Sequence, residues 1–169
     1  MTSGLHSDAY FEKFRVLESP DLTFRMLQLV VEPLQQMQID VIAGPTTGGV
    51  LVAFALAHML EKKAAYAEKP LDGRPGRVFR RGFDLAGKRV VVADDVATTG
   101  GSINDTLKAV EEQGGVPVAV ALLVDRTSGF DPGVPVFSAL KLKLQVWKPE
   151  QCPLCKQGLE LTVRGKGRS

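Results

Sequence analysis

Four short apolar runs alternate with segments of helical pattern, and this alternation restricts the possible folds more than any other feature. The runs have the length and composition of strands, and they occupy residues 39–43, 64–68, 89–93 and 116–124. Strands that alternate with helices form βαβ units, in which neighbouring strands are parallel and helices cover both faces. The sequence therefore predicts an α/β fold with a central, mostly parallel sheet.

Three other segments have helical spacing. The first covers residues 21–36 and follows a Ser-Pro sequence that favours a helix start. The second, residues 50–60, is rich in Ala and Leu, and the third, residues 103–113, ends at two glycines. Residues 70–81 instead combine Gly, Pro and Arg without periodicity, so we expect a loop there.

Length and composition indicate a single domain that spans residues 1–169. A chain of 169 residues with 44% hydrophobic residues can bury one sizeable core. Its net charge of +2 is far from that of a dedicated nucleic-acid binder, so a small anionic ligand is the expected partner. No apolar run approaches the ~20 residues that span a bilayer, and the start lacks a signal-peptide pattern. We therefore expect a cytoplasmic protein with no membrane or nucleic-acid partner.

The chemistry is expected directly after the run at residues 89–93, because ligands of parallel sheets bind beyond the carboxyl ends of the strands. Small residues and two glycines let successive backbone N–H groups converge on a phosphate, and the following helix directs its positive end to the same point. Three hydroxyl groups can add donors. The predicted phosphate cradle consists of Ala97, Thr98, Thr99, Gly100, Gly101 and Ser102.

Asp94 and Asp95 stand at the mouth of this cradle, where two carboxylates repel each other and a phosphate. Accepting hydrogen bonds from two sugar hydroxyls and holding a hydrated magnesium ion would offset that repulsion. The alternative is an ordinary turn at a strand end in which Asp95 caps the next helix.

The segment VVVADDVATTGGS, residues 90–102, resembles the motif that binds phosphoribosyl pyrophosphate (PRPP) in type I phosphoribosyltransferases. The resemblance implies that family's fold, a sheet flanked by helices with a small hood, here drawn from residues 1–20 and 145–169. It also implies that Asp94 and Asp95 hold the ribose hydroxyls and act in catalysis, and that residues 97–102 hold the 5-phosphate.

Residues 44–49 resemble the family's pyrophosphate loop, which implies roles for Thr46, Thr47 and Gly48 and a non-proline cis peptide. Lys69 matches the family's catalytic lysine by position. The loop arginines have no clear counterpart in the family, so their role in catalysis is a hypothesis based on charge, and a solvated basic loop is the alternative. They are Arg74, Arg77, Arg80 and Arg81.

Two places suggest orotate as the base. Residues 3–11 resemble the SGxxS segment of orotate phosphoribosyltransferases, which implies that Tyr10 and Phe11, with Thr98, flank the base; plain core aromatics are the alternative. Arg126 follows the run at residues 116–124, and its guanidinium could bind the carboxylate of orotate, as the resemblance implies. A surface arginine paired with a neighbouring aspartate is the alternative.

The expected reaction converts orotate and PRPP to orotidine 5′-monophosphate and pyrophosphate in pyrimidine (UMP) biosynthesis, with Mg²⁺. The family also implies a homodimer. Two other functions stay open: a phosphoribosyltransferase for a purine or another nucleobase, and a PRPP-sensing regulator without transferase activity. In the family a segment ahead of the position of Ser3 contributes a helix to the hood, and because the chain begins almost directly at this motif we expect that such a segment is absent or was removed.

Residues 147–158 resemble the ending of a bacterial subgroup of the same family and contain Cys152 and Cys155. One Cys-x-x-Cys pair offers two ligands, whereas a structural zinc site needs four. A half-site completed across a dimer, a redox pair and two ordinary thiols are all compatible with the sequence, and we expect no metal there.

Overall fold

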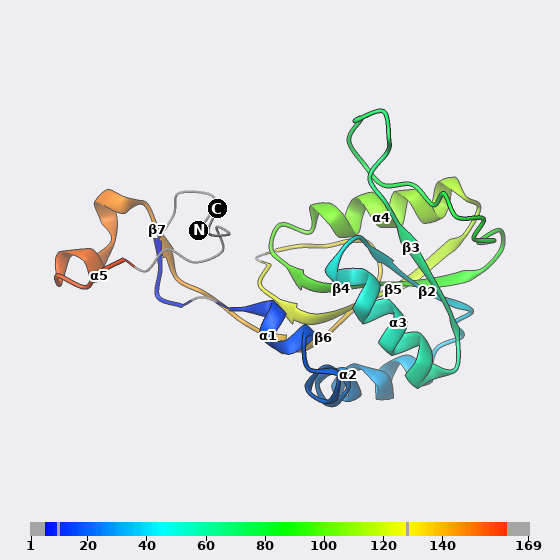
Figure 1. The fold of residues 1–169 in the computed structure, drawn as a ribbon, viewed down its shortest axis with the longest axis horizontal. Helices are drawn as coiled ribbons and strands as arrows, with labels where there is room; N and C mark the ends of the chain where they lie inside the picture. Colours follow the sequence, from blue (N-terminus) through cyan, green and yellow to red (C-terminus); the bar gives the residue numbers. More distant parts are fainter. Residues whose placement is uncertain (1–5, 10, 128, 162–169) are drawn as a thin grey trace. The chain divides into compact units, whose positions relative to one another are not determined.

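The computed structural model describes residues 6–9, 11–127 and 129–161. Tyr10, one of the two predicted base-flanking aromatics, lies outside the described residues. The chain divides into two compact units, which Figure 1 shows as ribbons. One unit combines Met1–Glu12 with Lys143–Ser169, and the other comprises Lys13–Leu142.

The larger unit contains a five-stranded sheet in the order β3-β2-β4-β5-β6. Every neighbouring pair is parallel, so all the carboxyl ends of the strands lie at one edge. This confirms the parallel α/β fold predicted from the alternating pattern. The strands are β2 (Val41–Pro45), β3 (Lys63–Ala67), β4 (Arg89–Ala97), β5 (Val116–Asp125) and β6 (Val136–Lys141).

Helices cover both faces of this sheet (Figure 1). Helix α4 lies on one face, and helices α2 and α3 lie on the other, where α3 contacts β2, β3 and β4. The three predicted helices are present, with bounds shifted by one or two residues. The helices of this unit are α1 (Lys13–Leu17), α2 (Pro20–Gln35), α3 (Gly48–Leu60) and α4 (Gly101–Glu112).

Alternation along the strands divides the core between the two faces. On the α4 face, Val90, Val92 and Leu122 pack with Ile103 and Val110 of the helix. Their neighbours in the strands point to the opposite face, toward α2 and α3. Full burial of such a side chain stabilises the fold by about 1.5–3 kcal/mol, so these contacts hold the loops at the carboxyl edge in place.

Strand β4 differs from the prediction, because it runs to Ala97 instead of ending at residue 93. Asp94 pairs with Leu122 of β5, and Val96 pairs with Val124. The pairing uses backbone groups, so polar side chains do not end the strand as the sequence pattern suggested. The acid pair therefore lies within a strand, not in the turn that follows it.

The smaller unit contains a two-stranded antiparallel sheet of β1 (His6–Ser7) and β7 (Val146–Trp147), then a 3₁₀ turn and the short helix α5 (Pro153–Lys156). Cys152 precedes α5 and is buried. Burial raises the pKa of its thiol, but hydrogen bonds from the Cys155 backbone, from His6 and from the Cys155 side chain outweigh burial and lower that pKa to about 7.

Among the described residues, no helix has the length and apolar character needed to cross a membrane.

Candidate active site

Three loops meet at the carboxyl edge of the sheet, and backbone hydrogen bonds fix two of them. The N–H of Thr46, after β2, donates to the carbonyl of Ala67 at the end of β3 (2.9 Å). The N–H of Arg126, after β5, donates to the carbonyl of Ala97 at the end of β4 (2.9 Å). The predicted pyrophosphate loop, phosphate cradle and base-binding arginine are thus brought to one edge.

The acid pair is buried and held by short hydrogen bonds. Asp94 accepts from the hydroxyl of Ser102 (2.8 Å) and from the N–H of Asp95 (2.9 Å), while Asp95 accepts from the N–H of Val96 (2.7 Å). The Ser102 hydroxyl proton is therefore used by the acid pair, although the sequence assigned that hydroxyl to the phosphate. These contacts orient both carboxyl groups before any ligand binds.

Lys13, which the sequence did not single out, completes this network. Its Nζ lies 2.9 Å from Oδ2 of Asp95, and the Asp95 side chain is only 5% exposed. That oxygen has no aligned hydrogen-bond donor among the described residues, so it can still accept from a hydroxyl. No motif marks Lys13, and only the packing of α1 brings it to the acid pair.

The environment of Asp94 favours its protonated form. Burial raises the pKa of its carboxyl group to about 6, and the adjacent Asp95 carboxylate adds to the increase. The hydrogen bonds from Ser102 and Asp95 and the charge of Lys13 act in the opposite direction. A ligand that donates hydrogen bonds to this pair would supply the stabilisation that water provides elsewhere.

The predicted cradle follows β4 and has the backbone that anion binding requires. Gly100 has φ +78°, in the left-handed region, and Gly101 begins α4. Such a left-handed residue before a helix turns successive N–H groups toward one point, where the helix dipole adds positive potential. Thr98 and Thr99 are exposed at the same turn, so their hydroxyls are accessible to a phosphate.

The predicted pyrophosphate loop approaches the acid pair closely. The Thr46–Thr47 peptide is cis, as the family resemblance implies. A Cβ atom on Gly48 would lie 1.8 Å from Oδ2 of Asp95, so only glycine leaves room for that carboxylate at the start of α3. The two loops therefore form one continuous surface around Asp95.

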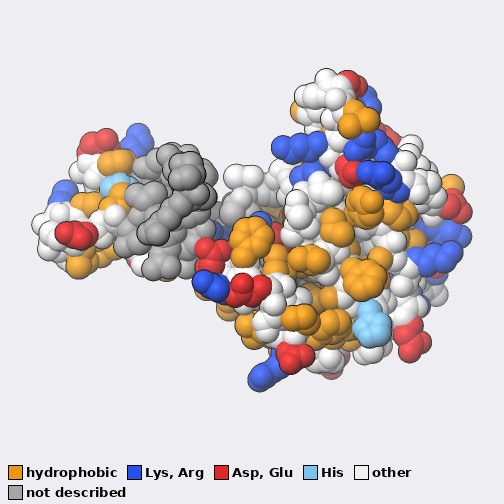
Figure 2. Space-filling view, in the orientation of Figure 1, with side chains coloured by type: hydrophobic (Ala, Val, Ile, Leu, Met, Phe, Trp, Pro, Cys, Tyr) orange, Lys and Arg blue, Asp and Glu red, His pale blue; other side chains and the backbone are white. Residues whose placement is uncertain are grey.

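One residue of the basic loop reaches this surface. Arg77 donates from Nη1 to the hydroxyl of Thr46 (3.0 Å). A bridge between Glu68 and Val78 holds the base of the loop. Figure 2 shows Lys and Arg side chains gathered around the projecting loop. Arg77 is thus the loop arginine that the structure brings to the pyrophosphate loop, a distinction that charge alone could not make.

The other cations of this loop lie elsewhere. Lys69, the predicted catalytic lysine, is exposed. The remaining arginines form ion pairs within their own segment, which corresponds to the solvated alternative: Arg80 and Arg81 pair with Glu68, and Arg74 pairs with Asp72.

Arg126 lies beside the cradle with an unused donor. Its Nε is buried and has no hydrogen-bond partner among the described residues. Asp125, the partner that the surface alternative requires, instead accepts from the N–H and the hydroxyl of Thr127 (2.9 and 2.6 Å). A buried guanidinium donor without a partner is costly, which points to a ligand as its acceptor. Phe11 is half-buried within the smaller unit.

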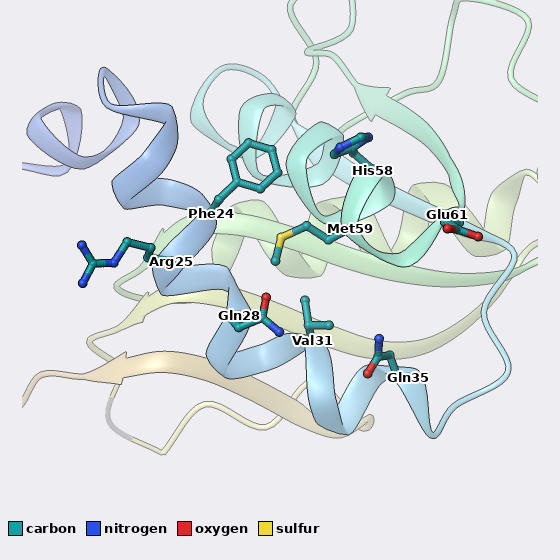
Figure 3. Close-up of a pocket in the computed structure, with 8 residues that line it drawn as sticks. All are labelled: Phe24, Arg25, Gln28, Val31, Gln35, His58, Met59 and Glu61. Carbon is teal, nitrogen blue, oxygen red and sulfur yellow. The ribbon is translucent and has the colours of Figure 1, made fainter.

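A separate groove of about 710 Å³ lies between α2 and α3 (Figure 3). Phe24 and His58 meet edge to face across it, with ring centroids 6.0 Å apart. His58 belongs to the last turns of α3, whereas the pyrophosphate loop precedes the first turn of this helix. The helix rises about 1.5 Å per residue, so the groove is remote from the acid pair.

Comparison with known proteins agrees with this arrangement. A family model described as the phosphoribosyl transferase domain matches residues 25–154. The chain therefore belongs to the type I phosphoribosyltransferase family.

Within that family the chain resembles orotate phosphoribosyltransferases. It is 35% identical to the enzyme of Caldanaerobacter subterraneus over 98% of this chain and 86% of the relative. It is 40% identical to that of Heliobacterium modesticaldum over 94% and 83% of the two chains. The structure of orotate phosphoribosyltransferase from Aeropyrum pernix is also similar, with a TM-score of 0.71 and 29% identity over 85% of this chain and 84% of the other.

A Mycobacterium tuberculosis orotate phosphoribosyltransferase solved in complex with PRPP has a TM-score of 0.63 and 26% identity, over 79% of this chain and 81% of the other.

Proposed function

We propose that this protein is an orotate phosphoribosyltransferase, which converts orotate and PRPP to orotidine 5′-monophosphate and pyrophosphate. The main observation in favour of orotate as the base is the Nε of Arg126, which lies buried beside the cradle without a hydrogen-bond partner among the described residues. A guanidinium binds a carboxylate with two parallel hydrogen bonds, and orotate carries a carboxylate whereas purine bases do not. The relatives named as orotate phosphoribosyltransferases support the same choice.

Different residues at the carboxyl edge of the sheet bind different parts of PRPP. The backbone N–H groups of residues 97–101 bind the 5-phosphate, and Asp94 and Asp95 accept hydrogen bonds from the two ribose hydroxyls. Thr46, Thr47 and Gly48 contact the pyrophosphate. Each group is set by the fold before the substrates arrive, so the site lowers the barrier through positioning.

The displacement at the anomeric carbon passes through an oxocarbenium-like state, as in glycoside cleavage. Positive charge develops on the ribose ring near the acid pair, while negative charge develops on the leaving pyrophosphate near Arg77. Lys13 forms an ion pair with Asp95, and Arg77 is positioned at Thr46 to meet the leaving group. The attraction of the acid pair for the ribose and the attraction of Arg77 for the pyrophosphate both strengthen as these charges develop, which is the condition for catalysis. Orotate is already an anion, so the site needs no strong general base.

The acid pair also fits magnesium, which prefers oxygen ligands and retains several waters in protein sites. Asp94 and Asp95 would hold the ion through water and the ribose hydroxyls, with Asp95 Oδ2 as the open acceptor. When bound, Mg²⁺ neutralises charge on the pyrophosphate.

Two copies of the chain form the working enzyme. Large apolar side chains on the surfaces of α2 and α3 are exposed, and Figure 2 shows hydrophobic side chains grouped over this part of the larger unit. Exposed apolar clusters of this kind mark protein interfaces. Light scattering should therefore give twice the chain mass. The side chains are Leu22, Leu29, Leu51 and Phe54.

The test is a transfer assay with purified protein, PRPP, Mg²⁺ and a panel of bases. Consumption of orotate with release of one pyrophosphate per base supports the proposal. Turnover of adenine or guanine without turnover of orotate would identify a purine enzyme instead. Binding of PRPP without transfer to any base would indicate a regulator.

A further inference from the structure

Three metal-binding side chains cluster in the smaller unit, remote in sequence but close in space. His6 lies in β1, Cys152 immediately precedes α5, and Cys155 lies within α5. One ligand atom from each residue lies within 4.8 Å of the others, and His6 Nδ1 is 3.2 Å from the Sγ of Cys155. The sequence showed only the two cysteines, because His6 is 149 residues from Cys155.

These separations suit a tetrahedral metal ion. Zinc binds cysteine sulfur at about 2.3 Å and histidine nitrogen at about 2.0–2.1 Å, so neighbouring ligand atoms lie roughly 3.5–3.8 Å apart. The ligand atoms of the observed cluster, which lie within 4.8 Å of one another, are close to that spacing. One imidazole and two thiolates are also ligands of the softness that zinc accepts and that magnesium and calcium do not.

The described residues of the smaller unit form little regular structure and bury few side chains. Strands β1 and β7 are two residues each, and Cys152 is the one buried side chain among those described in this unit. Units below about 40 residues usually need a metal, disulfides or a partner surface to stay folded. A metal ion at Cys152 would join the amino-terminal strand to the carboxyl-terminal helix at the point where the unit is packed.

We propose that His6, Cys152 and Cys155 bind one Zn²⁺ per chain, with a water molecule as the fourth ligand. The ion ties β1 to α5, and its site has three of the four protein ligands that a closed structural zinc site has. Its ligands are different residues from those of the acid pair and the phosphate cradle, so metal binding can be measured without the proposed transfer reaction.

The experiment uses the full-length protein, reduced and freed of metal, and titrates it with Co²⁺ followed by Zn²⁺. The chain has two cysteines and two histidines, so any sulfur-to-cobalt charge-transfer band arises from Cys152 and Cys155. We expect one equivalent of Co²⁺ per chain, the strong visible bands of tetrahedral Co²⁺, and loss of both signals when Zn²⁺ is added. Cys152→Ser and Cys155→Ser should each lower the affinity at least about tenfold.

His6→Asn should lower the affinity at least about tenfold as well, whereas His58→Asn, at the other histidine of the chain, should leave it unchanged. X-ray absorption of the zinc-loaded wild-type protein avoids reliance on the variants and should show two sulfur and two nitrogen or oxygen neighbours. The proposal is overturned by a wild-type protein without a thiolate band, by one metal per two chains, or by equal affinities of His6→Asn and the wild type. A Cys152–Cys155 disulfide that forms despite one equivalent of Zn²⁺ would identify a redox pair instead.

Discussion

The ammonium group of Lys13 lies 2.9 Å from Oδ2 of Asp95 and connects helix α1 to the strand that carries the acid pair. Asp95 is buried and its neighbour Asp94 is also a carboxyl group, so Lys13 supplies positive charge where two negative charges would otherwise repel. The same lysine also lies next to the positions that the ribose hydroxyls would take.

Replacing Lys13 by Met should lower kcat/KM for PRPP by about tenfold to 100-fold, because the acid pair loses its counter-charge in a buried setting. Lys13→Arg should retain most of the activity. The matched control is Arg15→Met on the same helix, since the exposed pair of Arg15 and Glu18 contributes little. Steady-state kinetics measures all three, and equal losses in Lys13→Met and Arg15→Met would show that Lys13 acts only through the surface of α1.

The raised pKa of Asp94 makes the free energy of unfolding depend on pH in a defined direction. The folded protein holds the Asp94 proton up to about pH 6, whereas an aspartate in the unfolded chain has its ordinary pKa of 3.8. Folding is thus favoured by protonation: this contribution is complete below pH 3.8 and is lost as the pH rises through about 6.

Asp94→Asn should therefore increase the free energy of unfolding at pH 7.5 by about 1–2 kcal/mol and change it little at pH 4. The amide oxygen can accept from the Asp95 N–H and the amide NH2 can donate to the Ser102 hydroxyl oxygen, while PRPP binding should be lost because the carboxylate is gone. Urea unfolding at the two pH values checks the stability, with Glu111→Gln on the exposed face of α4 as control. A stabilisation that is the same at both pH values would refute the assignment of the raised pKa.

Gly100 supports the cradle for two separable reasons. Its φ is +78°, and an added Cβ would lie 2.2 Å from Cε2 of Phe130. Gly133 has nearly the same φ, +76°, but its Cβ would meet nothing within 4 Å. Gly133→Ala should therefore cost about 1 kcal/mol from backbone strain alone, and Gly100→Ala about 1–3 kcal/mol more from overpacking.

Calorimetric titration should also show weaker PRPP binding by Gly100→Ala, with no change in Gly133→Ala. If the two variants unfold at the same denaturant concentration, Phe130 does not restrict the cradle.

Arg77 is the loop arginine that contacts the pyrophosphate loop, so its removal should affect turnover specifically. Arg77→Ala should lower kcat by about tenfold to 100-fold, since the charge it supplies is needed most as pyrophosphate leaves. Arg74→Ala removes an arginine of the same loop that pairs with Asp72, and kcat should then change less than about threefold. Stopped-flow or steady-state measurement of kcat compares the two variants. A larger loss of kcat in Arg74→Ala than in Arg77→Ala would contradict the role of Arg77 at the leaving pyrophosphate.

The sequence predicted the sheet, its main helices and the position of the cradle because these depend on local periodicity and on a contiguous motif. It did not predict that β4 extends to Ala97, since that depends on pairing with β5. Strand β6 was also missed: its side chains are half-buried or exposed, so it has no strong apolar signal. The contacts of Lys13 with Asp95 and of His6 with Cys155 were not predicted, because the partners in each pair are far apart in the chain.

Binding of the base carboxylate by Arg126 distinguishes orotate from other bases, and a comparison of orotate with uracil tests it directly. Uracil is orotate without its carboxylate. Arg126→Met therefore removes the guanidinium of the proposed interaction, and replacing orotate by uracil removes its carboxylate. We predict that Arg126→Met lowers kcat/KM for orotate by about 100-fold or more and changes that for uracil less than about threefold. Equal losses for the two bases, or no loss for orotate, would contradict the account.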